Sequence, residues 1–356
     1  MKRLDIILIL SVIFLTLFGL LMIYDASSFV AFRDFADKYH YIKGQLFWVV
    51  LGFGFLTAFT FFDYHRFYNL SLPLILASLA LLVMVFVPGI GVKLLGAHRW
   101  INLKVFLLQP TEFVKLSLGI YLAAWFSKKE KGRFLAFSLL LGLLLMLIIL
   151  QPDMGTAIVI MCEALVMYFL SGGNILYFTS AVPLIGILGF LLIKSSPYRA
   201  QRLATFLNPN QEVLTSSYHV KQILIALGNG GVFGVGLGNS LQKYAYLPEN
   251  TTDSIFAIIA EELGFIGATI LICVLAVVVW RGFRIAAKAP DNFGRLLAGG
   301  ITTFLAVQMI INLGAQTVLL PLTGIPLPFI SYGGSALIVD LCAVGILLNI
   351  ARQSHS

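Results

Sequence analysis

The feature that most constrains this chain is a series of apolar runs, each long enough to cross a lipid bilayer as a helix. The hydrocarbon core of a bilayer is about 30 Å thick, and a helix of roughly 20 apolar residues spans it. The first run ends at Tyr24, and 59% of the 356 residues are hydrophobic while only 11% are charged. The sequence therefore predicts an all-α polytopic membrane bundle of about ten transmembrane helices, forming a single domain over residues 1–356. The later runs fall near residues 45–62, 68–88, 108–126, 134–150, 154–170, 174–193, 254–280, 297–319 and 335–350.

Basic residues between the runs indicate how the bundle is oriented. Lys and Arg concentrate in the cytoplasmic connections of membrane proteins. The connection at 128–133 carries four of them, whereas the short connections at 151–153 and 320–334 carry none. We therefore expect cytoplasmic N- and C-termini and a long outer segment, about residues 194–253, between helices 7 and 8.

Charge and cysteine content exclude other classes of protein. The net charge of +8 is explained by the basic connections, so no nucleic-acid partner is expected. Cys162, Cys273 and Cys342 all lie in apolar runs, which indicates neither a disulfide framework nor a metal cluster.

The stretch at 247–253 is the best candidate for chemistry. It is polar, contains a proline and leads directly into an apolar run. Thr251, Thr252, Asp253 or Ser254 can cap the helix that follows, because a side-chain oxygen accepts an otherwise unpaired backbone N–H. A carboxylate at the mouth of a membrane span can accept a proton, although a plain helix cap is the alternative for Asp253. A helix N-terminus stabilises its anion, whereas an apolar pocket raises its pKa.

Several charged residues elsewhere require a partner in the bundle. Glu112 and Lys115 are three residues apart, so they can pair on one helix face, or Lys115 can meet a lipid phosphate. Asp153 can cap the next span or pair with a cation. Glu261 and Glu163 lie within apolar runs, where charged groups pair or face a cavity.

Three cations on the predicted outer side are candidates for binding a diphosphate. Arg binds phosphate through two hydrogen bonds and Lys acts as a point charge. The alternative for each is a side chain that reaches up to the lipid headgroups. The three residues are Arg99, Arg202 and Lys243.

The motifs, taken in order, resemble those of the SEDS family of peptidoglycan glycosyltransferases, which includes FtsW, RodA and SpoVE. The resemblance covers nearly the whole chain, and the GLGNSLQK stretch at 236–243 is closer to the division member FtsW than to RodA. The motifs are YDASS at 24–28, GAHRWIN at 96–102, QPTEFVK at 109–115, QPDMGT at 151–156, RLATFLNP at 202–209, the glycine run at 228–238, LPENTTD at 247–253, AEELG at 260–264 and LPFISYGGS at 327–335.

This resemblance implies a bundle in the bacterial cytoplasmic membrane that polymerises lipid II into glycan strands on the outer face. Asp253 would take the proton of the acceptor sugar hydroxyl as undecaprenyl diphosphate leaves the donor with inversion. The implied partners are a class B penicillin-binding protein and other divisome or elongasome membrane proteins. A divalent cation, Mg or Mn, could offset the diphosphate charge, but no carboxylate cluster defines its site. We infer that the substrate-binding residues are Arg99, Lys115, Arg202, Lys243, Glu249 and Ser331, with Glu112, Asp153 and Glu261 as polar bundle positions.

The chain also departs from the family pattern. Thr251 and Ser254 stand where the family usually has His and Phe beside the Thr-Asp pair, and Ala315, Gln316 and Val318 differ from the usual run near the last outer loop. Two other functions remain as alternatives, a lipid II flippase and a scaffold for the penicillin-binding protein. Intramembrane acids favour the first, and exposed helix faces rich in small residues favour the second.

Overall fold

The computed structural model describes residues 4–354 except 95–96, 105, 129–133, most positions in 175–195, 208–215 and 245. Long helices make up most of it, with one small antiparallel sheet. The elements are α1 (Ile6–Phe35), α2 (His40–Phe61), α3 (Arg66–Met84), β1 (Gly91–Leu94), β2 (Ala97–Asn102), β3 (Leu107–Leu108), α4 (Pro110–Phe126), α5 (Phe134–Leu150), α6 (Met154–Leu170), α8 (Pro197–Leu207), α9 (Ser216–Gly230), α10 (Ile255–Ala287), α11 (Asn292–Gln316) and α12 (Gly334–Gln353).

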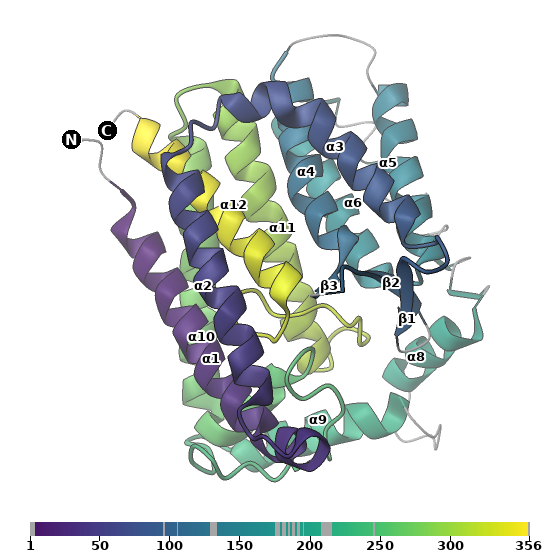
Figure 1. Ribbon diagram of the computed structural model, residues 1–356, viewed down its shortest axis with the longest axis vertical. Coiled ribbons are helices and arrows are strands. Elements are labelled where there is room, and N and C mark those ends of the chain that lie inside the picture. The colour runs from purple at the N-terminus through teal and green to yellow at the C-terminus, as the bar shows by residue number, and fades with distance from the viewer. Residues whose placement is uncertain are drawn as a thin grey trace.

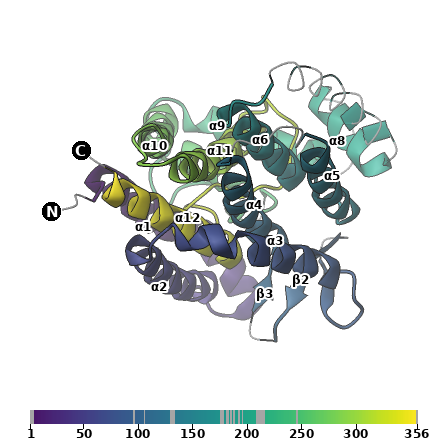
Figure 2. The same cartoon turned by 90° about the horizontal axis from the view of Figure 1, so that it is seen from above.

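The long helices lie side by side as a bundle, and both chain ends lie at the same end of it (Figure 1). The amphipathic helix α8 and the helix α9 lie at the opposite end, where α9 packs against both α8 and α10. Seen along the bundle, α11 lies in the interior, and it contacts α4, α6, α10 and α12 (Figure 2). Most residues of α11 are buried, so a polar side chain on this helix faces protein rather than lipid.

Among the described residues, six helices are long and apolar enough to cross a membrane by length and composition, namely α1, α2, α3, α10, α11 and α12. Helices α5 and α6 are shorter apolar helices, and their bounds are those that the sequence predicts. The predicted span at 174–193 falls mostly outside the described residues, so the count of ten spans stays a prediction.

The predicted end of the first helix was wrong. Helix α1 does not end near Tyr24 but continues to Phe35, because nothing in residues 25–35 breaks a helix: no Pro or Gly occurs there. The connection at 89–107, for which no regular structure was predicted, contains a three-stranded sheet in the order β1-β2-β3. Strand β2 pairs with β1 and with β3, so the sheet fixes Arg99 and Trp100 beside the end of the bundle.

Helix α10 is broken at Gly264, whose φ of 68° and ψ of −168° are not helical. The glycine-rich loop at 231–238 fills the break. Two of its N–H groups donate to the carbonyls of Glu261 and Glu262, each at 3.0 Å, and two of its carbonyls accept from the N–H groups of the residues after Gly264. A Cβ on Gly234 would lie 2.1 Å from the Glu262 carbonyl oxygen. The glycines therefore allow close approach to a neighbouring helix.

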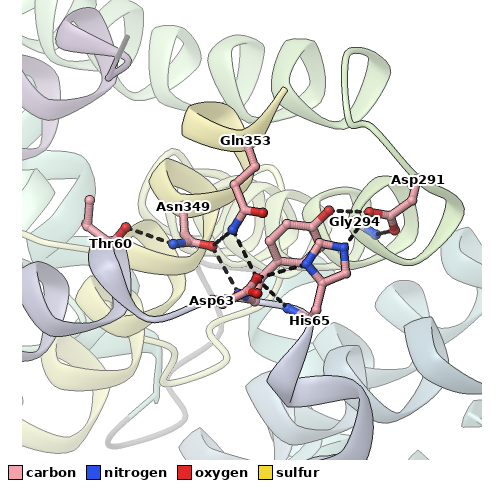
Figure 3. A network of polar contacts seen from close by, with 8 residues as sticks. Thr60, Asp63, His65, Asp291, Gly294, Asn349 and Gln353 are labelled. Carbon is pink, nitrogen blue, oxygen red and sulfur yellow. Dashed lines mark hydrogen bonds and ion pairs between the residues drawn. The ribbon is translucent and has the colours of Figure 1, made fainter. Parts of the chain in front are cut away.

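A polar network ties the helices together at the end that holds both termini (Figure 3). His65 lies between two carboxylates, with Nδ1 2.8 Å from Asp63 and Nε2 3.2 Å from Asp291, the N-cap of α11. Gln353 of α12 donates to Asp63 at 3.0 Å and to Asn349 at 2.9 Å. The α2–α3 connection is thereby joined to α11 and α12, which fixes this end of the bundle.

Candidate active site

A cavity of about 370 Å³ lies at the end of the bundle opposite the termini. Its walls come from β2, α8, α9, the segment before α10, the C-terminal end of α11 and the loop before α12. It thus brings together four of the residues predicted from the sequence, although they are widely separated along the chain. These residues are Arg99, Arg202, Glu249 and Asp253. Its polar lining includes Arg99, Gln109, Arg202, His219, Glu249, Asp253, Asn312, Gln316 and Tyr332.

Asp253 is held in this cavity by its main chain. Its carbonyl oxygen accepts two amide hydrogen bonds, from Gln316 Nε2 at 2.6 Å and from Asn312 Nδ2 at 3.1 Å. Of the four candidate caps, Ser254 is the N-cap residue of α10, and its side chain makes no capping hydrogen bond. Asp253 precedes the cap, so the alternative of a plain helix cap does not hold for it. Within the part of the chain that the structure describes, no hydrogen bond ties down the Asp253 carboxylate, so it can interact with a substrate.

The surroundings of Asp253 make its carboxyl group a better base than a surface aspartate. Burial, followed by the negative charge of Glu249, raises the pKa of Asp253 from 3.8 to about 7, although Arg202 and Arg99 oppose the rise. A general base works best when its pKa lies near the operating pH. The geometry and the charge balance at this position therefore suit proton transfer near neutral pH.

Arg99 and Arg202 are fixed in the cavity wall by backbone carbonyls. Arg99 donates through Nε to the Gln151 carbonyl at 3.1 Å and through Nη2 to the Pro152 carbonyl. Arg202 Nη1 donates to the Leu322 carbonyl at 2.7 Å. These hydrogen bonds hold the two guanidinium groups in fixed positions. An anion-binding site requires donors that are positioned in this way.

His219 is a cavity residue that the sequence reasoning missed. It lies on α9, and its Nε2 is 2.7 Å from Ser254 Oγ. Burial, followed by the charge of Arg202, lowers the pKa of His219 to about 4, so the imidazole is neutral at pH 7. Ser254, which stands where the family usually has Phe, therefore positions an imidazole in the cavity. The chain has Thr251 where the family usually has His, so His219 brings an imidazole to the cavity from a different segment. The only sequence signal was a solitary outer His.

The three polar residues on one face of α11 were also missed. Gln308, Asn312 and Gln316 follow one another at intervals of four, which places them in a row along the helix. All three are almost fully buried. Asn312 and Gln316 donate to the Asp253 carbonyl, and two of the row also bond to the loop before α12. Asn312 donates to the Ile325 carbonyl at 2.7 Å and Gln308 to the Pro326 carbonyl at 3.2 Å. The spacing of amides in an apolar helix could have revealed this row.

The predicted pairing of Glu112 and Lys115 is confirmed. Their side chains are each 2% exposed and lie 2.7 Å apart. Lys115 also donates to Gln308 at 2.7 Å, and neither residue lines the cavity. The nearby carboxylates of Glu163 and Asp340 are buried as well. Lys115 thus lies in the bundle interior, where it neutralises a buried acid and supports the amide row on α11.

Lys243 likewise lies outside the cavity lining. Its Nζ is 2.9 Å from Asp25 and 3.2 Å from Glu262, a carboxylate that the sequence reasoning gave no partner. Glu261, the predicted polar bundle position, bonds to Ser240 and to Asn229. This group of charges joins α1, the loop after α9 and the broken segment of α10.

Of the remaining predicted residues, one lines the cavity and two do not. Glu249 lines the cavity beside Asp253. Asp153 caps α6, as predicted, by accepting from the Thr156 N–H at 3.2 Å. Ser331 donates to the Thr252 carbonyl and accepts from the Leu327 N–H, so it braces the segment beside Asp253 without lining the cavity.

The acidic side chains at the site do not form an evident metal centre. Among the described residues, no three His, Cys, Asp or Glu side chains lie close enough together to hold a metal ion. Asp253 and Glu249 bring two carboxylates to the cavity, and two arginines already balance them.

Comparison of the sequence with known proteins gives matches over its whole length. The profile of the FtsW, RodA and SpoVE family, described as "Cell cycle protein", matches residues 5–356. The chain is 42% identical to "Stage V sporulation protein E" of Bacillus subtilis (strain 168), covering 99% of this chain and 98% of that protein. It is 40% identical to "Probable peptidoglycan glycosyltransferase FtsW" of Geobacter sulfurreducens, covering 99% and 96%.

Solved structures show the same fold. The rod shape determining protein RodA of Thermus thermophilus superposes with a TM-score of 0.74 at 27% identity, over 99% of this chain and 98% of that one. A chain from a structure described as "Structural coordination of polymerization and crosslinking by a peptidoglycan synthase complex" superposes with a TM-score of 0.80 at 26% identity, over 98% of both chains.

Proposed function

This chain belongs to the FtsW, RodA and SpoVE family, and on that premise we propose that it is a peptidoglycan glycosyltransferase that polymerises lipid II. The observation that supports this most is the position of Asp253, whose carboxylate faces a cavity that also holds two fixed arginines. A base and an anion site in one cavity are what sugar transfer from a lipid diphosphate requires.

In this reaction Asp253 acts as the general base. The acceptor hydroxyl loses its proton to the carboxylate as its oxygen attacks the anomeric carbon of the donor. The bond between that carbon and the diphosphate oxygen breaks, the diphosphate takes the bonding electrons, and the anomeric configuration inverts. Asp253 must then release the proton to water before the next cycle, which its pKa of about 7 favours.

Arg99 and Arg202 stabilise the leaving group. Negative charge on the diphosphate increases as the bond breaks, so fixed cations stabilise the transition state more than the ground state. The neutral His219 adds a hydrogen-bonding group beside them. Lys115 and Lys243 are assigned no contact with substrate in this scheme, because each is committed to buried carboxylates.

The membrane setting follows from the fold. The chain is a multi-pass membrane protein, and its basic connections support cytoplasmic termini and an outward-facing cavity. We infer the bacterial cytoplasmic membrane as its location and a class B penicillin-binding protein as its partner, because one solved relative comes from a complex that couples polymerization to crosslinking.

The test is polymerisation of lipid II by the purified complex with its cognate penicillin-binding protein. We expect long glycan strands from the unaltered chain and none from Asp253→Asn. Asp37→Asn is the matched control, because Asp37 is partly exposed, pairs with Lys43 at the surface and does not line the cavity. The proposed role of Asp253 fails if Asp253→Asn polymerises at the rate of the control.

A further inference from the structure

The three main-chain carbonyls that end at Asp253 are all held by hydrogen bonds from other segments. The Thr251 carbonyl accepts from the Tyr332 N–H at 2.9 Å, and the Thr252 carbonyl accepts from Ser331 Oγ at 2.6 Å. The Asp253 carbonyl accepts from two amides of α11. The position of the Asp253 carboxylate therefore depends on the loop before α12 as well as on α11.

One buried side chain of α2 holds this loop in turn. Gln45 is 1% exposed. Its Nε2 donates to the Ser331 carbonyl at 3.4 Å, and its Oε1 accepts from the Gly333 N–H at 3.2 Å. These two main-chain groups lie on either side of Tyr332. A single amide thus satisfies both groups and fixes the two residues whose hydroxyl and N–H hold the carbonyls before Asp253.

The same face of α2 packs against this loop. Positions 41, 45 and 48 follow one another at helical spacing, so their side chains share one face. The Tyr41 ring meets the Tyr332 ring edge to face, with the centroids 5.4 Å apart. A Cβ on Gly334 would lie 2.4 Å from the Trp48 ring, so only a glycine allows this close approach. Gln45 therefore lies between two aromatic contacts that join α2 to the loop.

The hydrogen bonds of Gln45 are all directed to this loop. Within the part of the chain that the structure describes, its amide bonds only to residues 331 and 333, and it does not line the cavity. An amide in an apolar helix costs free energy unless it is hydrogen-bonded, so these two bonds keep Gln45 in place.

We propose that Gln45 is a positioning residue for the general base. It holds the main chain of residues 331–333, and these residues hold the carbonyls that precede Asp253. The inference rests on the proposed function, in which Asp253 must be aligned with the acceptor hydroxyl. It assigns to α2, a helix that does not line the cavity, a part in setting the rate of the reaction.

The test compares two variants that each lose one buried amide. Gln45→Met keeps the approximate size of the side chain but has neither the N–H donor nor the carbonyl acceptor. Asn349→Leu is the matched control, because Asn349 is also fully buried, donates to the Thr60 carbonyl at 2.8 Å and accepts from the Tyr64 N–H at 3.0 Å. It belongs to the network at the end of the bundle that holds the termini (Figure 3). Both variants should lower the midpoint of thermal unfolding.

The effect on polymerisation of lipid II by the purified complex should differ between the two variants. We expect Gln45→Met to lower kcat about ten-fold at similar KM, because a displaced base is less well aligned with the acceptor hydroxyl. Asn349→Leu should keep the kcat of the unaltered chain. Gln45→Asn, which is one methylene shorter and cannot reach both main-chain groups, should also lower kcat. If Gln45 served only to fill space, Gln45→Met would keep the full rate.

Equal kcat values for Gln45→Met and Asn349→Leu would overturn this inference and leave the proposed function intact. Absence of glycan from the unaltered complex would count against both. If Gln45→Met does not assemble, Gln45→Asn decides the question, and a full kcat in that variant refutes the positioning role. If Asn349→Leu does not assemble, Gln353→Met replaces it, because it removes hydrogen bonds at the same end of the bundle.

Discussion

The raised pKa of Asp253 predicts how the rate of polymerisation depends on pH. Only the ionised carboxylate can accept a proton, and its pKa of about 7 lies well above the usual 3.8. The ionised fraction is then about 1% at pH 5, half at pH 7 and about 90% at pH 8. We therefore expect kcat/KM to fall about ten-fold for each pH unit below 7 and to level off above pH 8.

The cause of the raised pKa can be tested at Glu249. After burial, the charge of this residue contributes most to the rise. Glu249→Gln removes that negative charge, so the midpoint of the pH profile should move to lower pH. Asp37→Asn, at the surface, should leave the midpoint unchanged.

The assay measures the initial rate of glycan formation at a lipid II concentration well below KM, where kcat/KM reports groups of the free enzyme. The rate is followed from about pH 5 to about pH 9, with each sample returned to pH 8 to show that no activity is lost irreversibly. A rate that stays constant down to pH 5 would refute the reasoning, because an aspartate with an ordinary pKa is fully ionised there.

Three further predictions concern stability and positioning. Asp253→Asn should raise the midpoint of thermal unfolding at pH 8 but not at pH 4; a carboxyl group whose pKa rises on folding destabilises the fold only as the pH increases from 3.8 toward 7. Lys115→Met should destabilise the bundle by about 3–5 kcal/mol, because Glu112 is left buried and unpaired, and adding Glu112→Leu should restore most of the unfolding midpoint. Gln316→Leu should lower kcat by up to about 100-fold at similar KM, since it removes one of the two hydrogen bonds that hold the Asp253 carbonyl; Gln316→Met, which has no N–H donor either, should behave alike, and full activity in both variants would contradict this role.

Predictions that rest on local spacing were confirmed. The bounds of α5 and α6 follow from the lengths of their apolar runs. Asp153 caps α6 because a side chain at that position reaches the N–H three residues on. Glu112 and Lys115 pair because residues three apart lie on one face of a helix. In each case the partners are fixed by the geometry of a single helix.

Predictions about the site were only partly right. The sequence identified Asp253, Glu249, Arg99 and Arg202, and the structure brings all four into one cavity. It left a helix cap open as the alternative for Asp253, which instead precedes the N-cap residue Ser254. It also assigned Lys243 to a diphosphate, whereas this residue lies between Asp25 and Glu262. His219 and Gln316 were not recognised as cavity residues at all.

What the sequence determined by itself is the membrane bundle, the bounds of α5 and α6, the cap at Asp153 and the pair of Glu112 and Lys115, because hydrophobic length and helical periodicity act over a few residues. Only the tertiary structure decided which charges share a cavity and which are buried against one another. The break at Gly264, the bond between His219 and Ser254, and the meeting of two arginines from distant segments each depend on how separate helices pack. Side chains that lie a hundred residues apart have no fixed distance until that packing forms.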